Sequence, residues 1–163
     1  MSRDSFGIYY IEDVIRLQAT TDKVLKAVAD TAHADGVDDC TVCIPLDPAA
    51  SGKTAAFFYR TVLAENGVPV KVAPTTAGKG KLTRFLPFCS LAESGAVRVV
   101  RGDWNEAFFK ELEAFSGDLK VQKTQKDDQV DSCADAFGTL AKTVTMPAFV
   151  MPINTTASPI PRI

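Results

Sequence analysis

Residues 44–56 read IPLDPAASGKTAA and are close to a phosphate-binding loop. In the P-loop pattern G-x-x-x-x-G-K-[ST], Gly52, Lys53 and Thr54 fill the last three fixed positions. The first glycine of the pattern is replaced by Asp47, whose carboxylate would lie beside the phosphate charge that such a loop attracts. This one position separates a nucleotide site from a site built on a carboxylate.

The sequence on both sides of this stretch alternates between strand and helix patterns. The apolar run CTVCIPL (40–46) is typical of a strand covered on both faces, and residues 51–66 have a helical pattern closed by ENG. Further strands are predicted at 6–19, 68–73 and 96–100, and further helices at 20–36, 81–93, 103–115 and 126–142. This alternation predicts an α/β fold around a largely parallel sheet, with functional residues at the carboxyl ends of strands, where Asp47 stands.

Two of the predicted helices carry apolar stripes that we expect to face the core. The stripes consist of Trp104, Phe108, Leu112 and Phe115, and of Val130, Cys133 or Ala134, Phe137 and Ala141. The paired phenylalanines are also expected in the core rather than as platforms for stacking bases. They are Phe57, Phe58, Phe85, Phe88, Phe108 and Phe109.

The composition is that of one globular domain. Of 163 residues, 46% are hydrophobic and 23% are charged, which is enough for a core, and the net charge of −2 limits any nucleic-acid site to a local basic region. We assign residues 1–143 to the domain and predict that 144–163, with four prolines, form an irregular tail that drapes over the body or binds a partner. No apolar run approaches the roughly 18 to 20 residues of a membrane span. A cytoplasmic protein is expected.

The four cysteines include one C-x-x-C pair, Cys40 and Cys43. Zinc would need two more ligands at suitable spacing, which His33, Cys89 and Cys133 do not supply. We expect reduced, mostly buried thiols.

Three acids, Asp127, Asp128 and Asp131, lie in the first turn of the last predicted helix. Helical spacing shows two or three of their carboxylates to one region. One interpretation is that the helix dipole favours acids at this end. The other is a site for Mg²⁺ or Mn²⁺, which prefer carboxylate oxygens. The same alternatives apply to Asp47, which either forms a turn before Pro48 or serves as a ligand.

A carboxylate at the end of a strand, together with a carboxylate cluster on the last helix, suggests a two-metal phosphodiester site. In such a site two ions about 4 Å apart hold the attacking water and the leaving oxygen.

Five segments, in order along the chain, resemble the C-terminal nuclease domain of tailed-phage terminase large subunits. They are GIYYIEDVIRLQ, IPLDPAASGK, GVPVKVAPTTAGKGKLTRFLPFCSLAESGAVRVV, DWNEAFFKELEAFSG and KDDQVDSCADAF, and they cover about residues 7–138. The last segment is the most specific, because the family pattern is an acid pair followed three residues later by Asp and a small residue, here Ser132. The turn DPAASGKT resembles the family's nuclease turn better than a P-loop.

This resemblance implies a ribonuclease H-like or resolvase-like fold, with three layers and a mixed, largely parallel central sheet flanked by helices. It implies an endonuclease that uses Mg²⁺ or Mn²⁺ in a two-metal site and cuts concatemeric viral duplex DNA. Asp47, Asp128 and Asp131 would be catalytic, and these three with Asp127 would hold the metals. Double-stranded DNA, a portal protein and a small terminase subunit would be the partners, in the host bacterial cytoplasm.

The chain departs from the family pattern at its start, because the family's domain opens with a strand that carries its first catalytic Asp. Here the match begins near the end of the family's second strand, and neither Asp4 nor Asp13 takes that place. We therefore also consider a catalytically incomplete terminase fragment that binds DNA or portal without cutting, with an exposed sheet edge that pairs with another chain. A P-loop nucleotide binder is the third interpretation.

Four cations are candidates for contacts with DNA phosphates. Lys79, Lys81 and Arg84 lie around the glycine-bearing loop TTAGKGKLTR, and Lys53 is close in sequence to Asp47. The alternative for Lys79, Lys81 and Arg84 is a solvated loop and helix start, and the alternative for Lys53 is a pair with an acid.

Overall fold

The computed structural model describes residues 1–46, 50–74, 80–116 and 126–142. Asp47, Lys79 and the tail at 144–163 lie outside these ranges, so their predicted roles stay predictions. Strands and helices alternate along most of the chain, which confirms the α/β class. In order they are β1 (Ser2–Arg3), β2 (Tyr9–Ile11), α1 (Thr21–Asp35), β3 (Val42–Leu46), α2 (Ala50–Glu65), β4 (Val70–Pro74), α3 (Lys81–Glu93), β5 (Val97–Val99), α4 (Asn105–Ala114) and α6 (Asp128–Lys142).

The strands of the described ranges form two sheets, whereas the sequence predicts a single central sheet. One sheet has the order β1-β2-β5, with an antiparallel β1/β2 pair and a parallel β2/β5 pair, and the other is the parallel pair β3-β4. The pairing is therefore mixed, as expected. Apolar runs identify strands, but they do not specify which strand bonds to which, and so the break between the sheets could not be predicted.

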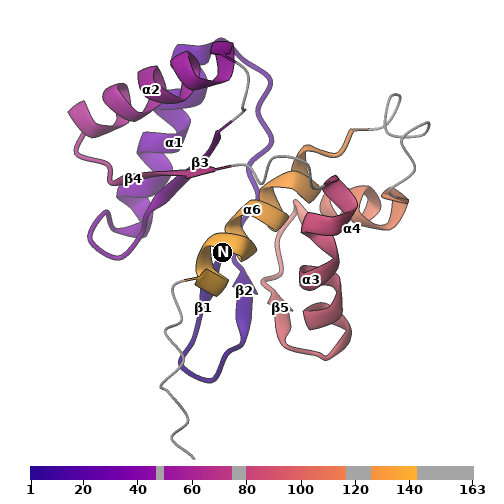
Figure 1. The fold of residues 1–163 in the computed structure, drawn as a ribbon. Coiled ribbons are helices and arrows are strands. Elements are labelled where there is room, and N and C mark those ends of the chain that lie inside the picture. The colour runs from indigo at the N-terminus through magenta and orange to yellow at the C-terminus, as the bar shows by residue number, and fades with distance from the viewer. Residues whose placement is uncertain (47–49, 75–79, 117–125, 143–163) are drawn as a thin grey trace, which may run out of the picture.

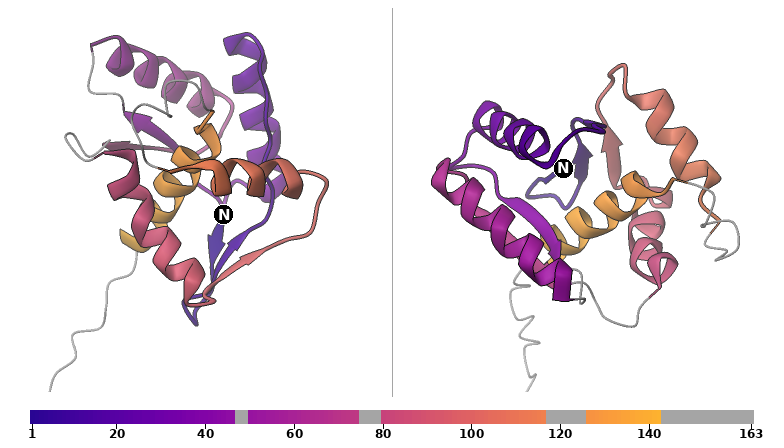
Figure 2. Two further views of the ribbon diagram at one scale, coloured as in Figure 1. Left: turned by 90° about the vertical axis from the view of Figure 1, so that its right-hand side faces the viewer. Right: turned by 90° about the horizontal axis from the view of Figure 1, so that it is seen from above.

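Helix α6 lies between the two halves of the molecule. In Figures 1 and 2, α1 and α2 lie with β3 and β4 on one side of it, while α3 and α4 lie on the other. It contacts α3, α4 and strand β3. The first turn of α6, which carries the predicted acids, is thus positioned by several elements at once.

Two hydrophobic clusters stabilise the two halves. One surrounds α6 and contains Ile11, Phe85, Phe88, Phe108, Val130, Cys133 and Ala134. The other lies between α1, α2 and the β3-β4 sheet and contains Leu25, Ala29, Ala32, Leu63 and Val68. Both predicted apolar stripes face the first cluster, apart from Ala141, which is exposed.

Three of the six phenylalanines predicted for the core are exposed. Phe57, Phe58 and Phe109 are 72%, 50% and 43% exposed. Phe57 and Phe58 lie on the outer side of α2, because the opposite side of this helix contacts β3 and β4. Adjacent residues on a helix point about 100° apart, so Phe109 faces outward while Phe108 faces the core.

The strand predicted at 6–19 is much shorter in the structure, since β2 ends at Ile11. It is preceded instead by a turn that Asp4 organises. The Asp4 carboxylate accepts hydrogen bonds from the amides of Phe6 and Ile8, both at 2.9 Å, and from the Tyr10 hydroxyl at 3.0 Å. These bonds lower the pKa of Asp4, the Ile8 amide most, and give the side chain a structural role.

No helix among the described residues combines the length and apolar character that crossing a bilayer requires.

Replacing Phe108 by alanine should lower the free energy of unfolding by about 3–5 kcal/mol, because its side chain is buried within the larger cluster. Phe57→Ala is the matched control and should cost about 0.5 kcal/mol or less, since Phe57 is 72% exposed. Denaturant titration measures both values. Equal losses in the two variants would contradict the assignment of Phe108 to the core.

Burial raises the pKa of Cys133 from 9.0 to about 12, so the native protein should hold about a thousandfold less thiolate at this position than an ordinary cysteine. A variant that keeps only Cys133 should react with a thiol reagent at mildly alkaline pH only after unfolding. A variant that keeps only Cys43, which is half-buried, is the control. Rapid labelling of folded Cys133 would contradict the packing of α6.

Candidate active site

The first two turns of α6 present a row of carboxylates to α3. Asp127, Asp131 and Asp135 are four residues apart, which places them one above another on the same helix face. The Asp127 carbonyl accepts a hydrogen bond from the Asp131 amide at 3.0 Å, so Asp127 lies where the helix begins. The side chain of Asp128 is exposed. The row therefore contains two of the three predicted acids of this turn, and one that was not predicted.

Two cations from the start of α3 bind this row. The Lys81 ammonium lies 2.8 Å from an Asp127 carboxylate oxygen and 2.7 Å from an Asp131 oxygen. The Arg84 guanidinium uses two nitrogens, one 2.8 Å from Asp131 and the other 2.8 Å from Asp135. The five side chains form one continuous network between α3 and α6.

The network leaves one net negative charge, because two cations face three carboxylates. Burial alone would lower the pKa of Lys81, but hydrogen bonds to Asp127 and Asp131 and their charges outweigh it, so its pKa is raised and the ammonium stays charged. Burial raises the pKa of Asp135, and the charge of Arg84 opposes that effect. The region is therefore rich in carboxylate oxygen and only partly neutralised.

The other predicted site residues have different settings. Lys53 is exposed in the first turn of α2, and Asp128 is exposed beside the carboxylate row. Lys81 and Arg84 were predicted to contact DNA phosphates, with a solvated loop and helix start as the alternative. In the structure both are paired with acids, which the sequence did not predict. Contact with DNA stays a prediction for all of these cations.

Sequence reasoning missed two further acids of this region. Asp135 could have been found, because it follows Asp131 by four residues and so shares its helix face. Glu111 is buried in α4, where its carboxylate accepts hydrogen bonds from Gln129 of α6. Its spacing of three from Phe108 places it on the buried face of α4, but nothing in the sequence names its partner.

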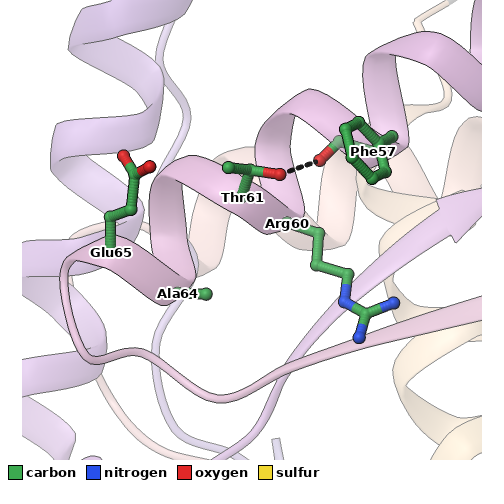
Figure 3. Close-up of a pocket in the computed structure, with 5 residues that line it drawn as sticks. All are labelled: Phe57, Arg60, Thr61, Ala64 and Glu65. Atoms are coloured by element: carbon green, nitrogen blue, oxygen red, sulfur yellow. Dashed lines mark hydrogen bonds between the residues drawn. The ribbon is translucent and has the colours of Figure 1, made fainter.

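A separate open hollow of about 520 Å³ lies against α2 (Figure 3). It is lined by Phe57, Arg60, Thr61, Ala64 and Glu65, all from one face of that helix. The hollow contains no residue of α3 or α6, and its single carboxylate offers no cluster of metal ligands. The predicted acids Asp127 and Asp131 lie in the α3/α6 region and not in this hollow.

A family model described as Terminase RNaseH-like domain matches residues 1–139, which is most of the chain and includes the whole α3/α6 region. The chain belongs to this family. This confirms the resemblance to the terminase nuclease domain, and with it the general expectation of a nuclease-type domain. Searches of curated proteins and of solved structures returned no match.

Asp127 and Asp131 supply the type of ligand that a hard divalent cation prefers, which is carboxylate oxygen. Both carboxylates already converge on one positive charge, the Lys81 ammonium. Among the described residues, no group of three or more His, Cys, Asp or Glu side chains is placed to hold a metal. A complete site would therefore need a ligand from elsewhere in the chain or a movement of Asp128.

Replacing Arg84 by methionine should destabilise the domain by about 2–4 kcal/mol, because Asp131 and Asp135 would then face each other, half-buried, without their shared cation. Adding Asp135→Asn should recover part of this loss. Denaturant titration of the single and double variants tests both statements.

The control for this prediction is Lys26→Met, which breaks an ion pair with Asp30 of 2.6 Å on the surface of α1. Both partners are largely exposed, so the loss should be about 0.5 kcal/mol or less. A similar loss for Arg84→Met would contradict the prediction that Asp131 and Asp135 depend on their shared cation.

Proposed function

We propose that this terminase domain is a metal-dependent DNA endonuclease whose site is built on the first turn of α6. The observation that carries the proposal is the convergence of Asp127 and Asp131 on a single cation, within the region matched by the family. Asp47, which follows the last residue of β3, and Asp128 are the further proposed ligands, with Asp47, Asp128 and Asp131 as the catalytic set.

Bound Mg²⁺ or Mn²⁺, as a pair, would lower the pKa of a water molecule and stabilise the charge that develops on the phosphate. The chain's own contribution is to hold the carboxylates together. Lys81 now neutralises the oxygens that would bind such an ion, so Lys81 has to leave at least one carboxylate when a metal binds. Arg84 can stay in place, because it also holds Asp135.

DNA is the proposed substrate, and the charge of the region suggests how it would bind. With one net negative charge, the five-residue network does not attract phosphates, whereas a bound divalent cation reverses its sign. Lys53, Lys79, Lys81 and Arg84 are the proposed phosphate contacts, which are independent of base sequence. Binding of metal and of DNA should therefore support each other.

The biological setting follows from the family and is part of the proposal. The domain would cut concatemeric viral duplex DNA during packaging, in the host bacterial cytoplasm, together with a portal protein and a small terminase subunit. Self-association through an exposed sheet edge is a further proposal, based on the separate sheets.

A second candidate function is a module that binds DNA or portal without cutting. The ion-pair network favours it, because Lys81 and Arg84 satisfy the carboxylates of Asp127 and Asp131 without any metal. This candidate predicts retained DNA binding with no cleavage and no heat on titration with manganese.

Nicking of supercoiled plasmid with manganese decides between the two functions. The wild-type chain should nick the plasmid and stop when a chelator is added, and Asp131→Asn and Asp128→Asn should each lower the rate by about a hundredfold or more. Asp30→Asn, on the surface of α1, is the control and should act as wild type. Unchanged nicking in both site variants would refute the assignment of these acids.

A further inference from the structure

Glu111 is a buried carboxylate that the proposed chemistry does not use. Its side chain is only 6% exposed and lies in α4, which packs against α6. One oxygen accepts a hydrogen bond from the Gln129 amide and the other from the Gln129 side-chain nitrogen, both at 2.6 Å. Arg16 contributes a longer ion pair of 3.6 Å from a side chain that is 44% exposed.

A carboxylate is strongly disfavoured in a buried position unless hydrogen bonds and opposite charge compensate it. Arg16 is distant and partly solvated, so the main compensation comes from Gln129 and from the start of α6. The first amides of a helix lack partners within the helix and carry partial positive charge. Glu111 therefore serves α6 as a capping side chain, supplied by another helix.

The position of Gln129 makes this bond relevant to the site. At 3.6 residues per turn, Gln129 points almost opposite to Asp127 and Asp131 on the same turn. The turn is thus bonded to α4 through Gln129 and to α3 through Asp127 and Asp131. Rotation of the helix start about its axis would break the bonds to Glu111 before it moved the carboxylates far.

We propose that Glu111 is a positioning residue that fixes the first turn of α6 and thereby holds the carboxylates of Asp127 and Asp131 together. The effect of Glu111 on metal binding rests on the proposed function. Its effect on the order of the first turn of α6 does not. Because Glu111 acts on the position of the carboxylates, replacing it should weaken metal binding. The loss should be larger than that in a packing variant whose domain is destabilised by the same amount.

The Gln129 side-chain oxygen suggests a conservative variant. It is buried and has no hydrogen-bond partner within the described ranges. In Glu111→Gln, the new side-chain oxygen can still accept a hydrogen bond from the Gln129 backbone amide. If the Gln129 side-chain amide rotates by half a turn, its oxygen can accept a second hydrogen bond from the new side-chain nitrogen. Glu111→Gln can therefore keep both bonds, whereas Glu111→Leu removes both at similar volume.

The experiment compares Glu111→Leu, Glu111→Gln and Phe137→Leu in the full chain. Phe137 packs against the same cluster further along α6, so its variant is a control for lost packing that leaves the first turn unchanged. Amide hydrogen exchange at residues 129–131 and calorimetric titration with Mn²⁺ are measured where circular dichroism shows each variant folded.

Glu111→Leu should speed exchange at 129–131 and weaken Mn²⁺ binding by about 10- to 100-fold, while Glu111→Gln and Phe137→Leu stay close to wild type. Unchanged exchange in Glu111→Leu overturns the proposal, as does an equal loss of Mn²⁺ affinity in Phe137→Leu. A wild-type chain that binds no Mn²⁺ counts against the proposed function instead. In that case, the exchange rates alone support or overturn the positioning role.

Discussion

The apolar face of α6 buries Val130, Cys133 and Ala134 against α3 and α4, and the remaining structure of the site depends on this packing. A helix fixed by one buried face has little freedom to rotate, because rotation would expose that face and move charged groups inward. The carboxylates are therefore directed at α3 by apolar contacts on other parts of the same helix. Their mutual repulsion is opposed by packing as well as by Lys81 and Arg84.

The ion-pair network is a weak source of stability for its size. Half-buried charges lose hydration, and apolar side chains of similar volume often stabilise a helix interface as well as or better than ion pairs do. Burial raises the pKa of Asp135 although Arg84 lies 2.8 Å away, as expected for a carboxylate that has lost hydration. Under the proposed function, these carboxylates are kept together in order to bind cations.

Much of the fold could be predicted from local patterns, and the limits of that prediction are physical. Helical spacing located α3 with both of its ends, and apolar periodicity identified Phe108 and Val130 as core residues. The pairing of strands into two sheets could not be predicted, because it depends on contacts between distant segments. The same limit applied to the site, where the acids of α6 were evident from the sequence but their bonds to Lys81, Arg84 and Glu111 were not.

The phosphate contact predicted for Lys81 and the pairing with acids found in the structure are compatible when charge is considered. Without a metal, its ammonium is held by Asp127 and Asp131, which keeps its pKa raised and its charge neutralised. A divalent cation that takes both carboxylates would remove both partners of Lys81 and leave a charged lysine, 37% exposed, at the edge of the site. Under the proposed function, Lys81 becomes available for a DNA phosphate only when a metal is bound. The pairing seen in the structure would therefore limit DNA binding to the state that is able to cut.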